Sequence, residues 1–323
     1  SNVKILTPRK SSVASSITGF GSAVAVLGSK SRFKENSGTD ILTVAPTAGN
    51  PKQYFADSNE DGFADVVVSA PTTTVNSNAG VGILQVYYGN TSRLFNPSDL
   101  YNLFSDSNPL SDSGINSVTC SDFTTINATT KQLCKPVIIS SASLSASAGI
   151  GSSQSQFAVG DVTGDGLLDL AVGAPGENVI GAGSGAALVF ASVKNGGLSP
   201  TYRKIYTKYA DTSDAFGTSV VIGNFSGDKS NDQLAKGNNT PPFVDFPYGD
   251  LFAGSPNDEV SRPGGGAVYG FYTQDTALPS TLSTHTKLLT ESLASFTEYG
   301  LGETKLVGDI NNDGYIDAVS KIT

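Results

Sequence analysis

The sequence predicts an all-β fold built from repeated units of four antiparallel strands. Glycine is abundant, with 36 residues, and serine and threonine are frequent, which suits many short strands joined by tight turns. Charged residues make up only 15% of the chain, and long amphipathic stretches with a period of 3.6 are missing. The third observation is an acidic motif that recurs along the 323 residues, each time directly before an apolar run.

This motif defines an internal repeat, which is the first feature to seek in a chain of this length. Residues 54–71, 157–175 and 306–320 each consist of an acidic nonapeptide followed by a β-branched apolar run. Residues 220–232 form a degraded copy, whose apolar continuation at 250–256 comes after an insertion. We interpret each apolar run after the acidic segment as the second strand of a repeating unit.

Two further strands are predicted in each unit. Glycine-rich turns introduce a third strand at residues 80–90, 185–192, 265–273 and 19–29. A fourth strand follows at 202–207, 285–290, 40–44 and 136–140. Four short strands per repeat are typical of a β-propeller blade.

The chain is therefore predicted to form a single β-propeller domain over residues 1–323. Its units are a partial blade at 1–46, blades at about 47–140, 141–209 and 210–290, and a partial blade at 291–323, with insertions at 105–136 and 226–249. Residues 3–7 and 316–322 both read as second strands. Either these ends share one blade in an incomplete or small ring of about four or five blades, or sequence or a partner outside this chain completes them.

Oxygen-bearing side chains recur at every second position of the acidic nonapeptides. Their positions one, three, five and nine are Asp57, Asn59, Asp61 and Asp65; Asp161, Thr163, Asp165 and Asp169; and Asp309, Asn311, Asp313 and Asp317. Oxygen donors spaced in this way on a tight loop converge on one point, and Ca²⁺ takes six to eight oxygen ligands. A glycine at position six gives each loop the backbone freedom to fold around an ion.

Two other interpretations of these loops are weaker. Asp, Asn and Gly also form ordinary β-turns, but three copies at the same place before a strand favour calcium. An EF-hand loop needs a glutamate at position twelve and flanking helices. Position twelve is instead Val68, Val172 or Ser320, inside a predicted strand.

The complete pattern resembles the FG-GAP repeats of the integrin α-subunit N-terminal propeller. Tyr299-Gly300 and Phe216-Gly217 match the first element, and Gly173-Ala174-Pro175 matches the last. The resemblance implies calcium ligands at loop positions one, three, five and nine, with the backbone carbonyl of position seven as a further ligand. The carbonyl ligands implied in this way are those of Phe63, Leu167 and Tyr315.

The resemblance thus implies about three calcium sites, with departures in two loops. Thr163 replaces the usual Asn or Asp and is a weaker donor. In the degraded copy, the five positions are Asn224, Ser226, Asp228, Ser230 and Asp232. Lys229 stands there in the place of the glycine, which argues against tight calcium binding at a fourth site.

The two cysteines and the glycosylation sequons indicate an oxidising, secreted environment. Cys120 and Cys134 lie close together in a Ser/Thr/Asn-rich stretch, which favours one disulfide over two reduced thiols. Asn90, Asn127 and Asn238 begin Asn-x-Ser/Thr sequons, as does Asn224, where a glycan would exclude a metal. With Ser1 first and no methionine, we expect the chain to be a portion of a longer product.

Composition also disfavours several classes of function. The net charge of -9, without any Lys/Arg run, argues against a nucleic-acid partner, and no apolar stretch is long enough for a transmembrane helix. His285 is the only histidine, which argues against a Ser-His-Asp triad or a histidine-based zinc site. A glycosidase needs a pair of carboxyls at one bond, but the paired aspartates belong to the predicted loops. We therefore predict that the protein is not an enzyme.

The resulting functional hypothesis is an extracellular or cell-surface calcium-binding module that is non-catalytic and binds a protein or glycan in adhesion or protein interaction. One alternative is a structural block of an extracellular filament or coat, which would bind copies of itself. A second alternative is a carbohydrate-binding or accessory domain of a larger enzyme.

Overall fold

The computed structural model describes fourteen stretches and single residues of the chain. These are residues 16–27, 65–87, 137–139, 143–163, 168–193, 197–207, 209, 211–223, 225, 249–259, 265–272, 286–290, and the pair 303–308 and 317–321. Almost all regular structure in them is β-strand, and every strand pairing is antiparallel. The predicted all-β class is confirmed.

In the described residues, the strands form three four-stranded sheets and one two-stranded sheet, each in chain order. The first contains β1 (Val24–Leu27), β2 (Asp65–Ala70), β3 (Ile83–Tyr87) and β4 (Val137–Ile139). The second contains β5 (Phe157–Gly160), β6 (Asp169–Ala174), β7 (Ala186–Val193) and β8 (Gly197–Ile205). The third contains β9 (Ser219–Gly223), β10 (Asp250–Ser255), β11 (Ala267–Phe271) and β12 (Thr286–Thr290), and the fourth contains β13 (Glu303–Gly308) and β14 (Asp317–Lys321).

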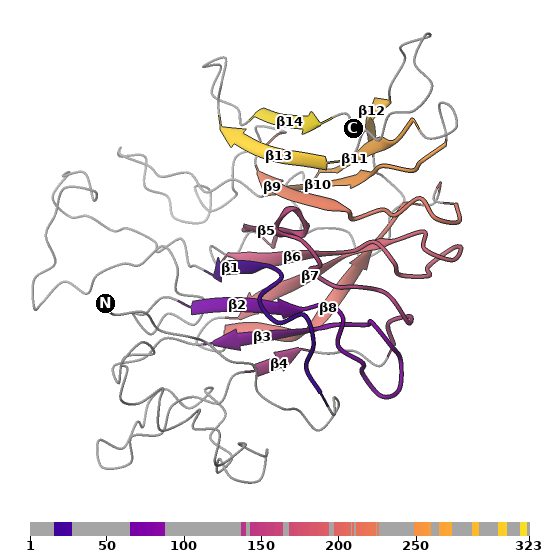
Figure 1. The fold of residues 1–323 in the computed structure, drawn as a ribbon. Helices are drawn as coiled ribbons and strands as arrows, with labels where there is room; N and C mark the ends of the chain where they lie inside the picture. The colour runs from indigo at the N-terminus through magenta and orange to yellow at the C-terminus, as the bar shows by residue number, and fades with distance from the viewer. Residues whose placement is uncertain are drawn as a thin grey trace, which may run out of the picture.

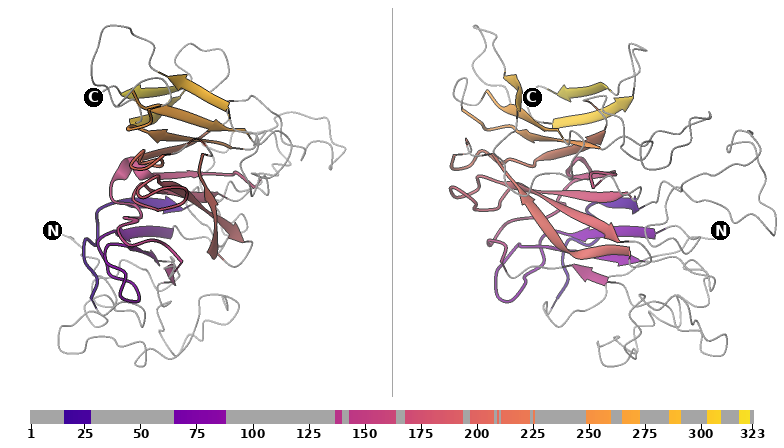
Figure 2. Two further views of the ribbon diagram at one scale, coloured as in Figure 1. Left: turned by 90° about the vertical axis from the view of Figure 1, so that its right-hand side faces the viewer. Right: turned by 180° about the vertical axis from the view of Figure 1, so that it is seen from behind.

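The sheets follow one another like consecutive propeller blades. β5 contacts β1 on one side and β9 on the other, and β9 also contacts β13, so the first strands of successive sheets are neighbours. Figures 1 and 2 show the four sheets in a row, with β1 to β4 at one end and β13 and β14 at the other. This arrangement is the one expected for an FG-GAP type β-propeller.

The first sheet differs from the prediction in its first strand. Residues 19–29 were predicted as the third strand of a partial blade at 1–46, but β1 pairs with β2, with Leu27 opposite Asp65. That assignment was wrong, because an apolar run bounded by glycines identifies a strand without identifying its partner. Phe20-Gly21 precedes β1 as Phe216-Gly217 precedes β9, so the first blade begins well before residue 47.

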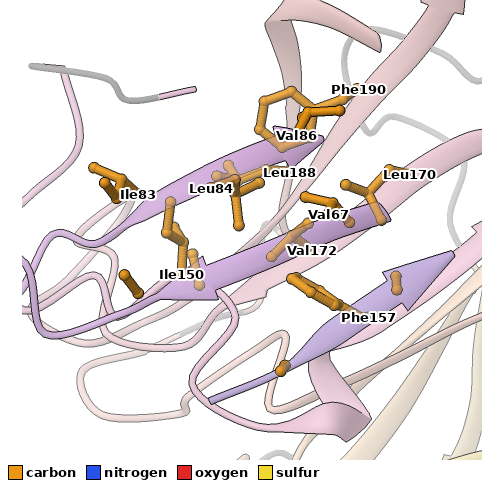
Figure 3. Packing of buried hydrophobic residues seen from close by; sticks show 14 of the residues in the cluster. Val67, Ile83, Leu84, Val86, Ile150, Phe157, Leu170, Val172, Leu188 and Phe190 are labelled. Carbon is orange, nitrogen blue, oxygen red and sulfur yellow. The ribbon is translucent and has the colours of Figure 1, made fainter. Parts of the chain in front are cut away.

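Buried side chains form one layer between the first and second sheets and another between the second and third. Figure 3 shows Val67, Leu84 and Val86 of the first sheet near Leu170, Val172, Leu188 and Phe190 of the second, with Ile150 and Phe157 beside them. On the second sheet, the neighbouring residues Ala171, Ala187 and Val189 belong to a different cluster, which includes Leu251 and Tyr269 of the third sheet. Because side chains alternate between the two faces of a strand, a sheet buried on both faces has continuous apolar strands.

A short 3₁₀ helix, Gln154–Gln156, precedes β5. Its Gln154 side chain accepts a hydrogen bond from Val24 N at 3.1 Å and donates from Nε2 to Val24 O at 2.9 Å. It therefore ties the first strand of the first blade to the start of the second. Among the described residues, no helix is long and apolar enough to span a membrane.

Several sequence-based predictions concern residues outside the described part of the chain. They are the strand at 3–7, the fourth strand at 40–44, the insertion at 105–136, the Cys120–Cys134 disulfide, and the sequons at Asn90, Asn127, Asn224 and Asn238. Ring closure between residues 3–7 and 316–322, the disulfide and the glycans stay predictions.

Candidate metal centre in the second blade

An aspartate begins the second strand of every sheet. Asp65 lies opposite Leu27, Asp169 opposite Gly160, Asp250 opposite Gly223 and Asp317 opposite Gly308. The side chains of Asp65, Asp169 and Asp250 are fully buried. In the first, second and last sheets this aspartate is position nine of a predicted calcium loop, so the register places the ninth position identically in each repeat.

The carboxylate of Asp169 closes the second loop. Its Oδ2 accepts hydrogen bonds from the backbone N–H groups of Val162 and Thr163, both at 3.0 Å. Its Oδ1 accepts a third from Ser192 N at 2.9 Å. The first two bonds hold position nine against positions two and three of the same loop.

Ser192 is a contact that the sequence analysis missed. Besides the bond from its backbone N–H, its hydroxyl donates to Leu168 O at 2.7 Å. The pairing of Leu170 with Phe190 would have identified it, because continuing this antiparallel register by two residues places Ser192 opposite Leu168. The hairpin register would thus have revealed Ser192, but a single sequence does not determine that register.

Positions one and three of the loop provide further oxygens. Asp161 is 1% exposed, and its backbone carbonyl accepts a hydrogen bond from Gly249 N at 2.6 Å. Within the described residues, Thr163 Oγ1 is the buried side-chain oxygen or nitrogen that lacks a hydrogen-bond partner. A buried polar atom without a partner is unfavourable and calls for an explanation such as an ion. The donor set of Asp161, Thr163 and Asp169 therefore fits a hard cation such as Ca²⁺.

The remaining predicted ligands are not described. Asp165 and Leu167 of the second loop lie outside the described residues, as do Asp57, Asn59, Asp61 and Phe63 of the first and Asp309, Asn311, Asp313 and Tyr315 of the last. In the parts of the chain that are described, no three Asp, Glu, His or Cys residues gather closely enough to hold a metal. The metal sites thus stay a prediction, supported at the second loop by Asp161, Thr163 and Asp169.

The third sheet differs from the sequence-based alignment of its loop. Asp232 was aligned as position nine of the degraded copy, but Asp250 is the aspartate that begins β10 and pairs with Gly223. Residues 226–249 therefore lie inside the loop, between its second position and its last.

Glycines of the repeated motif meet at the boundary between the second and third sheets. The Gly217 N–H donates to Gly254 O at 2.8 Å, within its own repeat. A Cβ on Gly173 would lie 1.9 Å from Gly217 O, and a Cβ on Gly217, whose φ is +88°, would lie 2.2 Å from Ala186 O. The close backbone approach explains why glycine occurs both after Phe216 and before Ala174.

Comparison with known proteins agrees with this geometry. Residues 153–190 match the family model of the FG-GAP repeat, and this segment includes β5, the second loop, β6 and most of β7. No curated protein matches the chain. The chain therefore carries an FG-GAP repeat at residues 153–190, set in a series of antiparallel blade-like sheets.

Proposed function

We propose that this protein is a non-catalytic, extracellular interaction module whose FG-GAP blades are fastened by calcium. The observation that carries the proposal is the second loop, where the buried Asp161 and Asp169 carboxylates accompany a buried Thr163 hydroxyl without a hydrogen-bond partner. This loop lies inside the segment that matches the FG-GAP repeat.

Each loop would hold its ion with the residues that its spacing provides. In the second blade these are Asp161, Thr163, Asp165, Asp169 and the carbonyl of Leu167. Calcium, when bound, would supply positive charge that offsets the repulsion among these carboxylates. The chain's own contribution is to hold position nine against positions two and three through the Asp169 hydrogen bonds.

The interaction role rests on the type of fold and on the composition. Propellers present loops from every blade on two faces, which suits recognition of another macromolecule. The chain has one histidine, so the common acid–base and nucleophilic constellations lack a key member. The cysteine pair and the sequons favour an extracellular location.

The calcium part is tested by isothermal titration calorimetry of the metal-depleted protein with CaCl₂. We expect about three sites in the wild type and one fewer in the Asp161→Asn variant. Glu259→Gln is the matched control, because Glu259 is exposed and outside the predicted loops. Absence of calcium binding by the wild type, or equal stoichiometry in wild type and Asp161→Asn, would contradict the proposal.

The interaction part is tested by light scattering coupled to size-exclusion chromatography and by screening a glycan array. An interaction module should be monomeric at all concentrations and bind a defined protein or glycan in calcium. Concentration-dependent self-association would favour an assembly role instead. Hydrolysis of an array glycan would contradict the non-catalytic part.

A further inference from the structure

The third blade has the same closing carboxylate as the second, although the acidic pattern of its loop is degraded. Asp250 Oδ2 accepts a hydrogen bond from Phe225 N at 2.9 Å. In the third blade, Asp250 pairs with Gly223, and Phe225 is the second residue after that glycine. In the second blade, Asp169 pairs with Gly160, and Val162 is the second residue after that glycine. The two bonds are therefore equivalent in the two blades.

The side chains beside this bond differ between the two blades. The Phe225 ring stacks on Phe252, with centroids 4.0 Å apart and an angle of 16° between the rings. Tyr272 packs edge-on against Phe252 at 6.0 Å and 87°. By register, the second blade has the aliphatic residues Val162 and Ala171 where the third has Phe225 and Phe252.

These aromatic residues join the third blade's first three strands. Phe225 follows β9, Phe252 lies on β10, and Tyr272 follows β11. They pack with the buried Val221 and Val268 in a cluster separate from the core shared with the second sheet. The base of the loop is thus fixed by contacts from all three strands.

The sequence of the third loop complements this observation. The segment from Phe225 to Asp250 is far longer than the seven-residue separation between positions two and nine in the calcium loops, and it includes the positively charged Lys229. We propose that the third blade is closed without calcium, by an aromatic clamp of Phe225, Phe252 and Tyr272 together with the Asp250 hydrogen bond. The contrast with the other blades rests on the proposed calcium sites, but the clamp itself does not.

Apolar packing and a hydrogen bond from a backbone N–H need no metal ion. The clamp should therefore stabilise the third blade equally with and without calcium. It also fixes the base of the insertion at 226–249, since Phe225 and Asp250 flank this segment in the chain.

The first test compares melting temperatures in saturating CaCl₂ and in excess EDTA. Phe225→Ala and Asp250→Ala, which remove the ring and the acceptor oxygen, should lower the melting temperature by several degrees, and by the same amount in both solutions. Asp161→Asn should lower it in CaCl₂ only. Tyr272→Phe, which keeps the ring, is the control and should leave it unchanged. A loss for Phe225→Ala or Asp250→Ala that disappears in EDTA would overturn the clamp.

The second test counts calcium ions by calorimetry, which remains decisive if Phe225→Ala does not fold. Asp250→Asn and Asp232→Asn should each bind as many ions as the wild type. One ion fewer in either variant would show that the third loop is a metal site and would overturn the proposal. If the wild type binds no calcium, the proposed function fails, whereas equal melting losses in both solutions would still support the clamp.

Discussion

Glycine residues from two consecutive repeats determine how closely the second and third sheets approach. A residue with a Cβ atom does not fit in place of Gly173, because the carbonyl oxygen of Gly217 occupies that space. At the corresponding place in the first sheet, Ser69 donates its hydroxyl to Gly151 O at 2.7 Å. A hydrogen bond there replaces the direct backbone contact, which shows how the repeat tolerates a small polar side chain.

Gly173→Ala should therefore destabilise the protein by about 3 kcal/mol, in the range of overpacked core positions. The new methyl group would displace the Gly217 backbone, and with it the third sheet. Chemical denaturation measures the loss. Gly181→Ala is the control, because the atom nearest to its added methyl is the Thr212 hydroxyl, which can rotate away. Equal losses in both variants would contradict this explanation.

Asp214 is a buried acid whose charge is unfavourable in the folded state. Burial raises its pKa, and the nearby carboxylates of Asp258, Asp211 and Glu259 add to this effect, although the Asp211 N–H bond opposes it. A raised folded-state pKa means that the folded protein holds the proton more tightly than the unfolded chain does. The contribution of Asp214 to the stability of the folded protein is therefore fully present below the unfolded pKa of about 4. It is lost as the pH rises through the folded-state pKa.

Asp214→Asn should consequently be more stable than the wild type at neutral pH, and this advantage should shrink as the pH falls towards about 4. The asparagine oxygen can still accept the Asp211 N–H, which lies 2.6 Å from Asp214 Oδ2. Urea denaturation across a pH series provides the measurement. A difference in stability that does not vary with pH would refute the assignment.

Polar side chains also connect successive blades, whose strands belong to separate hydrogen-bonded sheets. Glu177, in the turn after β6, pairs with Lys204 of β8 at 2.6 Å and accepts a hydrogen bond from Ser145 N at 2.8 Å. The short helix Gln154–Gln156 makes a similar connection to β1 through Gln154. Turns and helix insertions therefore contribute contacts between blades in addition to the apolar layers.

Gln154→Ala should remove both hydrogen bonds to Val24 and speed hydrogen exchange at the Val24 amide. Because this contact is exposed, the loss of global stability should be only about 1 kcal/mol. Hydrogen exchange followed by NMR measures the first effect and denaturation the second. Ser199→Ala, a half-buried site in β8 whose hydroxyl bonds only locally to Thr201 in the described structure, is the control. Unchanged exchange at Val24 would show that Gln154 does not protect this strand.

At the scale of the whole molecule, stability should depend on calcium through the loops that join first and second strands. A ligand that binds only the folded state stabilises it by about 2.7 kcal/mol per site at a hundredfold excess over Kd. Excess EDTA should therefore lower the melting temperature in a calorimetric scan, and added calcium should restore it. A melting curve that is the same in EDTA and in calcium would contradict a structural role of the ion.

The all-β class, most strands and the repeating position of the acidic loops were predictable from the amino-acid sequence. These features are local, since glycine turns, apolar runs and oxygen spacing are visible within one short segment. The resemblance to FG-GAP repeats followed from the same segments and agrees with the match at residues 153–190.

The pairing of strands that are far apart in the chain became clear from the three-dimensional structure. β1 joins β2 across a long intervening segment, Asp250 rather than Asp232 begins β10, and Ser192 meets Asp169. Each of these depends on the register between strands, and a strand's own residues do not specify its partner. The physical reason is that pairing is chosen by the burial of whole sheets, such as the layers on both faces of the second blade.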